Sequence, residues 1–324
     1  MRNRESVLSH LKRSYTAALA FPRVRKLLVT LPLTRGLVWR FVAGENFATA
    51  VDSVKRLNMQ GLSATLNFVG THVNDAAEAR SAASHVAASL PAIRRNRLDA
   101  NASIRLTKIG LDIDENLCIE NLHLILRSAQ RAGVFVWIDM EESRYFESTL
   151  RCFEDAQTHF GPALVGIVLQ SYLKRLTMAA LDRLIALQSR IRIVKGGYWE
   201  PSDVAYRKRE QIDERFREHV GRLLMSDVKQ PAIATHDAAF FDFATTLAAA
   251  RATRPEQFEF QLLYGIRPDL AHALARCGYR VRVYVPYGRD WSSYFAGCAR
   301  RSIEALRPVL ERRCCSTKKL HRLI

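Results

Sequence analysis

The chain has 324 residues, of which 48% are hydrophobic and 25% are charged. This balance is typical of a globular protein and excludes a largely disordered one. No apolar run has the roughly 20 residues that would cross a bilayer, and the first residues contain no apolar segment of a secretory signal peptide. We therefore expect a cytoplasmic protein, with peripheral attraction to the inner face of the cell membrane as the alternative.

The formal net charge of +17 suits a nucleic acid, an anionic membrane surface or an anionic ligand as the partner. Much of this charge lies near the two ends of the chain, within residues 2–26 and 307–322. Neither end contains a recognisable nucleic-acid-binding module, so we expect no nucleic acid to bind. Attraction to a membrane surface and plain solvated charge both remain open.

The six cysteines are scattered and lack the spacing of metal ligands. Reduced thiols in a cytoplasmic protein are the simplest interpretation. The sequence predicts no metal site.

Residues 1–60 indicate a helical N-terminal arm. From residue 61 onwards, short apolar runs alternate with longer amphipathic ones, which is typical of repeated βα units. The predicted strands are Ser63–Phe68, Ala102–Leu106, Val134–Asp139, Leu164–Leu169, Ile191–Val194, Ala232–Thr235, Phe258–Leu263 and Arg280–Val285. The predicted helices span residues 75–96, 114–132, 142–159, 175–188, 202–226, 237–251, 267–276 and 290–306.

Eight such units predict an α/β protein with a (β/α)8 TIM-like barrel over residues 61–307, followed by a basic C-terminal tail over 308–324. A doubly wound open sheet is the rival fold. That fold usually carries a glycine-rich phosphate loop after its first strand, and Gly70-Thr71-His72 does not provide one.

The stretch Arg192-Ile-Val-Lys-Gly-Gly-Tyr-Trp-Glu200 is the strongest single indication of a ligand site. It places two cations at the end of a buried strand, then two glycines that let a ligand approach the backbone. Two aromatic side chains follow and offer stacking surfaces. An anionic, aromatic cofactor fits this combination, although strand–glycine–helix junctions are also common in α/β folds without such a role.

Polar residues recur at the predicted carboxyl ends of the strands, where barrel enzymes place their working groups. They are Arg105, Asp139, Met140, Glu141, Gln170, Arg192, Lys195, Thr235, His236, Asp237, Glu259, Gln261 and Tyr284. Burying these polar side chains requires partners, and convergence on one rim would supply them.

Several of these residues have an ordinary structural alternative. Asp139 and Asp237 could each cap the helix that follows. Glu259 and Gln261 could form a buried pair inside the barrel. Arg300 and Arg301 could grip a carboxylate with forked donors or lie on a solvated helix face.

Taken together, the chain resembles the FAD-dependent proline dehydrogenase family of the short monofunctional kind. The resemblance rests on motifs in the family's order that cover nearly the whole chain. They are Arg40-Phe-Val-Ala-Gly-Glu45, Ile109-Gly-Leu-Asp112, Ile138-Asp-Met-Glu141, Val168-Leu-Gln170, Arg192 to Glu200, Ala234-Thr-His-Asp237, Phe258 to Gly265, Val281 to Gly288, and Arg300-Arg301 with Glu304.

The resemblance implies a (β/α)8 barrel that holds FAD non-covalently, oxidises L-proline to 1-pyrroline-5-carboxylate in proline catabolism and passes the electrons to a membrane quinone. Arg192 would then stabilise negative charge near flavin N5, and Asp139 would order the cationic end of the site. The remaining cofactor contacts implied are Met140, Gln170, Lys195, Gly196, Gly197, Tyr198, Trp199, Thr235, His236, Asp237, Gln261 and Glu304. The substrate contacts implied are Arg105, Tyr284, Arg300 and Arg301.

Three positions depart from the family pattern. Arg105 stands where the family has lysine, which keeps the charge but replaces a point charge by a planar fork, and Lys108 could fill the role instead. Trp137 stands where arginine is usual. The segment from Tyr294 to Arg300 is about three residues longer, or nearly one helical turn. Two alternatives follow: a flavin-dependent dehydrogenase of a proline analogue such as hydroxyproline or a biosynthetic intermediate, and a non-catalytic basic barrel that binds a ligand, nucleic acid or membrane surface.

Overall fold

The computed structural model describes residues 39–70, 73–289, 291 and 294. The predicted arm before residue 39, the helix predicted at 290–306, the tail, and with them Arg300, Arg301 and Glu304, lie outside the described residues except for Trp291 and Tyr294.

Eight parallel strands close into a barrel in sequence order, with β1 pairing β8 through registers such as Thr65 with Tyr284. The predicted (β/α)8 barrel is confirmed, and the open sheet is excluded. The strands are β1 (Ser63–Phe68), β2 (Ala100–Arg105), β3 (Val136–Asp139), β4 (Val165–Gln170), β5 (Arg190–Val194), β6 (Ala232–Ala234), β7 (Glu259–Leu263) and β8 (Arg280–Tyr287).

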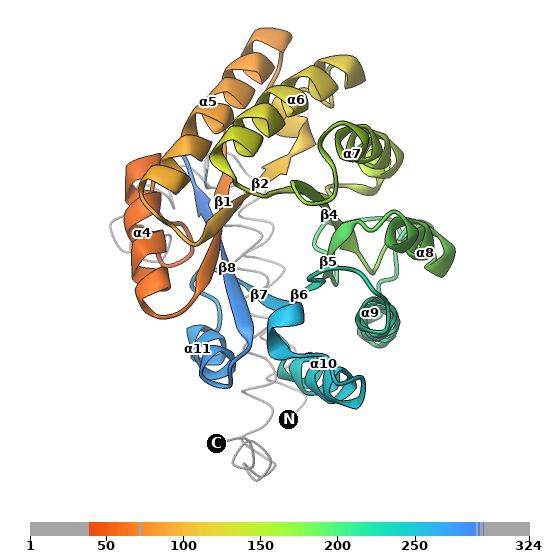
Figure 1. Cartoon of the computed structure of the whole chain (residues 1–324). Coiled ribbons are helices and arrows are strands. Elements are labelled where there is room, and N and C mark those ends of the chain that lie inside the picture. The colour runs from red at the N-terminus through yellow and green to blue at the C-terminus, as the bar shows by residue number, and fades with distance from the viewer. Residues whose placement is uncertain (1–38, 71–72, 290, 292–293, 295–324) are drawn as a thin grey trace, which may run out of the picture.

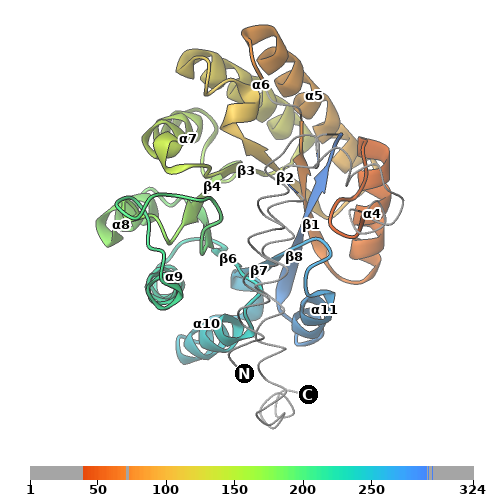
Figure 2. The same ribbon diagram turned by 180° about the vertical axis from the view of Figure 1, so that it is seen from behind.

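Helices form a ring outside the strands (Figures 1 and 2). They are α4 (Phe47–Met59), α5 (Ala76–Arg95), α6 (Glu115–Ala132), α7 (Phe146–Phe160), α8 (Met178–Ala186), α9 (Arg209–Leu224), α10 (Ala238–Ala250) and α11 (Pro268–Arg276). Short 3-10 turns occupy Leu106–Ile109, Ser143–Tyr145 and Pro255–Gln257. α4 precedes the first strand and packs beside β1 and β8, so it covers the seam where the barrel closes.

The predicted boundaries differ from the structure where backbone hydrogen bonds have other partners. Strand β3 begins at Val136 rather than Val134, because the Val134 N–H caps helix α6 by donating to the Ala129 carbonyl. Helix α9 begins at Arg209 rather than near 202, because the preceding loop pairs with the loop after β4. There the Tyr206 N–H donates to the Tyr172 carbonyl at 2.8 Å.

The barrel interior combines an apolar layer with buried polar pairs. Arg282 donates to Glu259 at 3.0 Å and to the Ala64 carbonyl at 2.8 Å, and Thr65 donates to Asn101 at 2.6 Å. Every one of these side chains is buried, so the mutual bonds offset the cost of removing them from water. The polar interior below the mouth is therefore a stable floor for the site above it.

Candidate active site

A cavity of about 530 Å³ opens at the carboxyl ends of the strands, where the sequence places most of the candidate residues. Its lining includes fourteen predicted site residues: Arg105, Asp139, Met140, Gln170, Arg192, Lys195, Gly196, Gly197, Tyr198, Thr235, His236, Asp237, Gln261 and Tyr284. The cavity volume lies within the usual range for ligand pockets. Convergence on one rim is thus observed for these fourteen residues, whereas Glu141, Trp199 and Glu259 do not line the cavity.

Arg192 is the centre of the network beneath this cavity. Its side chain is 3% exposed, and it ends in a guanidinium that donates to Gln261 at 3.0 Å and to Ser103 at 2.9 Å. It also forms an ion pair with Asp139. A guanidinium fixed by three acceptors from three strands keeps one orientation, so its positive charge has a set position at the cavity floor.

Asp139 accepts from three neighbours and does not cap a helix. Its carboxylate receives Arg192, the Ser103 hydroxyl at 2.8 Å and the Tyr284 hydroxyl at 2.8 Å. The N-cap positions of the elements that follow are Glu142 for the 3-10 turn and Tyr145 for α7, so Asp139 does not stand at either helix start. The capping alternative for Asp139 is therefore wrong.

Tyr284 stays protonated at neutral pH. Burial raises the pKa of its hydroxyl well above the ordinary value, and the nearby Asp139 carboxylate raises it further. The hydroxyl is therefore a permanent donor to Asp139. The ring also lies 5.4 Å from the Arg192 guanidinium carbon, within cation–π range.

Glu259 and Gln261 both point into the barrel, while Phe258 and Phe260 pack outward with Tyr279. The predicted buried pair is formed, because the Gln261 amide nitrogen donates to the Glu259 carboxylate, which also pairs with Arg282. Gln261 sits one layer higher and reaches the cavity as an acceptor for Arg192. The buried pair therefore involves both residues, and Gln261 also lines the cavity.

The loop after β5 is hydrogen-bonded to the end of β4, which in turn is hydrogen-bonded to the loop after β3. The Gly197 N–H donates at 3.2 Å to Gln170, whose amide nitrogen in turn donates to the carbonyls of Met140 and Glu141. Gly196 has φ of +135°, and a Cβ there would lie 2.2 Å from the Tyr172 ring. Glycine at position 196 is therefore required by both conformation and space.

Lys195 lies between two carboxylates, Asp213 at 2.5 Å and Asp237 at 3.1 Å. Burial would raise the pKa of Asp237, but Lys195 and Arg209 hold it below its usual value. Asp237 also caps α10 by accepting from the Ala239 N–H, so it both caps the helix and lines the cavity.

His236 and Thr235 line the cavity but also have structural partners. The His236 ring nitrogen Nε2 accepts from the Leu263 N–H at 2.9 Å, which fixes its tautomer with the proton on Nδ1. The Thr235 hydroxyl accepts from the Asp237 N–H at 3.2 Å.

Arg105, rather than Lys108, is among the residues that line the cavity. Burial would lower its pKa, but the surrounding Tyr198, Tyr284 and Glu141 outweigh burial and raise it. Glu141 has its own pKa raised by burial, against the effect of Arg105, and accepts from Thr107 at 2.8 and 3.0 Å.

The structure also places Trp137, a departure from the family pattern, and Trp199, a predicted cofactor contact. Trp137 is fully buried on the inward face of β3, below Asp139, with its ring 5.1 Å from the Arg192 guanidinium carbon. Trp199 is 77% exposed, packs with Arg207 and does not belong to the cavity lining, so its predicted cofactor contact lacks support.

Other residues of the site were missed from the sequence. Ser103 lies on the same face of β2 as Arg105, so the alternation of a strand could have revealed it. Arg209 and Asp213 lie one turn apart at the start of α9, and no local pattern marks them. Tyr172 and Tyr294 add aromatic surface to the cavity.

A family model described as proline dehydrogenase matches residues 50–293, which include the whole described barrel. The chain belongs to the proline dehydrogenase family. It is 40% identical over 258 residues to proline dehydrogenase 1 of Bacillus subtilis, a match that covers 79% of this chain and 83% of that protein. It is 37% identical over 274 residues to proline dehydrogenase of Deinococcus radiodurans, covering 82% and 87%.

Solved structures of proline utilization A share the fold of this family member. The protein from Bdellovibrio bacteriovorus superposes with a TM-score of 0.76 at 21% identity, covering 82% of this chain and 32% of that one. The protein from Corynebacterium freiburgense gives 0.70 at 23% identity, covering 94% and 35%. The chain thus spans about a third of these larger proteins, and the likeness concerns their barrel.

Proposed function

We propose that this member of the proline dehydrogenase family oxidises L-proline to 1-pyrroline-5-carboxylate, with FAD bound in the barrel mouth. The observation that carries the proposal is the single cavity in which Arg192, Asp139 and Tyr284 form one hydrogen-bonded group beside the Lys195-Gly-Gly exit. Family membership implies a redox cofactor in general, and the chemistry of this cavity favours a flavin dinucleotide.

The residues present fit such a cofactor. Five cations line the cavity, and four tyrosines provide flat surfaces, which suits a pyrophosphate joined to aromatic rings. Lys195, Gly196 and Gly197 would hold the phosphate side, and Gln170 with Gln261 would contact the ring system. Bound FAD would supply the two-electron acceptor that oxidation of a C–N bond to C=N requires.

The chain's own contribution is orientation and electrostatics. Arg192 presents a fixed positive charge where negative charge would develop, and such preorganised charge is worth most in a site that excludes water. Asp139 holds this guanidinium in place, and its hydrogen bond from Tyr284 fixes the tyrosine ring over the cavity. Arg105 offers a forked cation to a carboxylate, with Arg300 and Arg301 as further predicted contacts.

The electron acceptor is proposed to be a quinone in a membrane. No helix among the described residues combines the length and the apolar character that crossing a membrane would need. We propose that contact with a bilayer rests on the basic character of the chain, which has a net charge of +17. We propose a cytoplasmic location with peripheral attraction to the membrane.

The test is proline-dependent reduction of an artificial electron-accepting dye by the purified full chain, with and without added FAD. Turnover with proline above that with hydroxyproline and other cyclic imino acids is the expected result. A substrate panel in which a proline analogue is turned over best would redirect the assignment to that analogue. Absence of activity on every member, with FAD present, would favour a non-catalytic barrel.

A further inference from the structure

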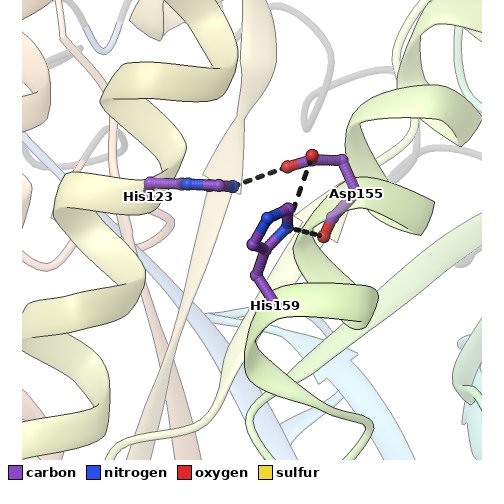
Figure 3. A group of neighbouring side chains, drawn as sticks. All are labelled: His123, Asp155 and His159. Carbon is purple, nitrogen blue, oxygen red and sulfur yellow. Dashed lines mark hydrogen bonds and ion pairs between the residues drawn. The ribbon is translucent and has the colours of Figure 1, made fainter.

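A second group of polar side chains lies outside the barrel, on the interface between helices α6 and α7. His123 projects from α6, while Asp155 and His159 project from α7 one helical turn apart (Figure 3). The three side chains converge on one point from the two neighbouring helices. The catalytic arrangement described above uses none of them.

The distances bring one ligand atom of each residue within 4.8 Å of the others. His123 Nε2 lies 2.5 Å from Asp155 Oδ2, and His159 Nδ1 lies 3.4 Å from Asp155 Oδ1. Ligand atoms in tetrahedral zinc sites bond at about 2.1 Å from the metal and hence lie about 3.4 Å apart. The distance between His159 and Asp155 already equals this spacing, and the distance between His123 and Asp155 would increase by about an ångström.

Neighbouring groups limit the movement of the three side chains. The rings of His123 and Phe160 pack nearly perpendicular to each other, with their centroids 5.2 Å apart. Asp155 and His159 have a fixed i, i+4 spacing because both belong to the same helix. The Nδ1 atom of His159 also contacts the Asp155 backbone carbonyl at 2.8 Å, so binding would turn this nitrogen from the carbonyl to the metal.

We propose that His123, Asp155 and His159 form a binding site for a divalent transition metal, with Zn²⁺ as the preferred ion. Two imidazoles and one carboxylate suit Zn²⁺, whereas Ca²⁺ and Mg²⁺ prefer an all-oxygen set. The His159 side chain is 54% exposed, which leaves room for water as the fourth ligand.

The site is separate from the barrel mouth. Helix α7 begins near the carboxyl end of β3, and Asp155 lies about 14 Å further along the helix axis. None of the three residues belongs to the described lining of the active-site cavity. The site therefore joins two outer helices, and its occupancy would stabilise their packing rather than supply chemistry to proline oxidation.

Isothermal titration with Zn²⁺ alone tests the proposal on the full chain, prepared without a histidine tag and stripped of metal. The titration uses a Cys314→Ser, Cys315→Ser background, because these adjacent thiols could bind zinc independently. One equivalent of zinc should bind. His123→Gln and His159→Gln should each weaken binding by about tenfold to a hundredfold, at least the loss seen for outer-shell partners of zinc ligands.

His272→Gln is the matched control, because His272 is a partly exposed histidine on α11, away from the cluster, that contacts Gln60. It should bind zinc as the parent does. Zinc should also raise the melting temperature of the parent and of His272→Gln but not of His123→Gln. Equal affinity in all variants, or no binding by the parent, would overturn the proposal and leave the cluster as an ordinary histidine–aspartate contact.

Discussion

Among single residues, Arg192 is the most important for the proposed reaction, because its guanidinium joins three strands of the barrel. Ser103, Asp139 and Gln261 each accept from it, and all are buried or nearly so. A lysine would keep the charge but has a point-like ammonium that cannot reach the same three acceptors. The orientation of the cation, and not only its charge, should therefore determine how much it accelerates the reaction.

We predict that Arg192→Lys lowers kcat for proline by about a hundredfold, comparable to the loss of one preorganised donor. The matched control is Arg282→Lys, which makes the same exchange in the buried pair with Glu259 below the cavity. It should leave kcat nearly unchanged while costing stability. Equal loss of kcat in both variants, measured by dye reduction on folded protein, would place the effect in barrel stability instead.

Tyr284 allows a second prediction at this scale. Tyr284→Phe removes the donor to Asp139 Oδ2 and should destabilise the protein by about 1.5–3 kcal/mol, the net value of a hydrogen bond to a charged group. Denaturant unfolding measures this change. Because the pKa of Tyr284 is raised, its hydroxyl stays protonated and remains a donor at alkaline pH. The variant should also lose activity, and this loss should be equal at every pH of the alkaline range. A loss that disappears at alkaline pH would show that the hydroxyl ionises.

The site residues differ in how far the sequence predicts them. Asp139, Arg192 and Tyr284 follow from the rule that working groups lie at strand ends, because a closed parallel barrel brings those ends together. Asp213 and the histidines of the α6–α7 cluster come from separate helices, and only the fold brings them near their partners. Pairing between outer helices has no sequence periodicity that would reveal it.

At the scale of elements, His219 connects helix α9 to the end of strand β4. The side chain is completely buried, and its Nδ1 lies 2.9 Å from the Ser171 hydroxyl. Burial, with a smaller effect of Arg215, lowers the pKa of His219 to about 4. The imidazole therefore remains neutral in the folded protein at pH values where the unfolded chain binds a proton.

This difference predicts acid sensitivity. The unfolded chain takes up the proton near pH 6.5 and the folded protein only near pH 4, so stability falls as the pH drops through that window. The loss from this residue should reach about 3 kcal/mol, at 1.4 kcal/mol per pKa unit. His219→Gln should flatten the fall in unfolding free energy, whereas His272→Gln should not. An unchanged pH dependence in His219→Gln would refute the assignment.

Gly265 fixes the segment before α4 against the loop after β7. Its φ is +74°, and a Cβ there would lie 1.9 Å from the Arg40 carbonyl oxygen. Gly278 has a similar φ of +84° but open space around the added atom, so it isolates the conformational cost. The sequence indicates that both glycines lie at junctions between elements. It does not reveal which of them lies against another segment of the chain.

We expect Gly278→Ala to cost about 1–2 kcal/mol from backbone conformation alone. Gly265→Ala should cost about 1–3 kcal/mol more, because the Arg40 backbone must also move. Urea unfolding of both variants measures the difference. Equal costs would mean that the segment around Arg40 is not held against the barrel in solution.

At the scale of the whole molecule, the barrel was predictable because its βα rhythm is strong in the sequence and connections in such folds are local. The predicted strand positions agree closely with the structure, whereas the starts of β3 and α9 differ because backbone groups there bond to the end of helix α6 and to the loop after β4. The division into an arm over 1–60, a barrel over 61–307 and a tail over 308–324 stays a prediction.

The net charge of +17 leads to a prediction for the whole chain. The purified protein should sediment with vesicles that contain anionic lipid at low salt and be released as salt is added, because screening shortens the range of the attraction. Vesicles of neutral lipid are the control. Binding that is equal on both kinds of vesicle, or insensitive to salt, would show that charge does not carry the protein to a membrane.

The most direct test of the central claim is the visible absorption spectrum of the purified full chain, recorded before and after proline is added without oxygen. The account predicts flavin bands that proline bleaches, and bleaching that is much slower in Arg192→Lys. A protein that binds no flavin when FAD is added, or whose flavin bands proline leaves unchanged, would contradict it.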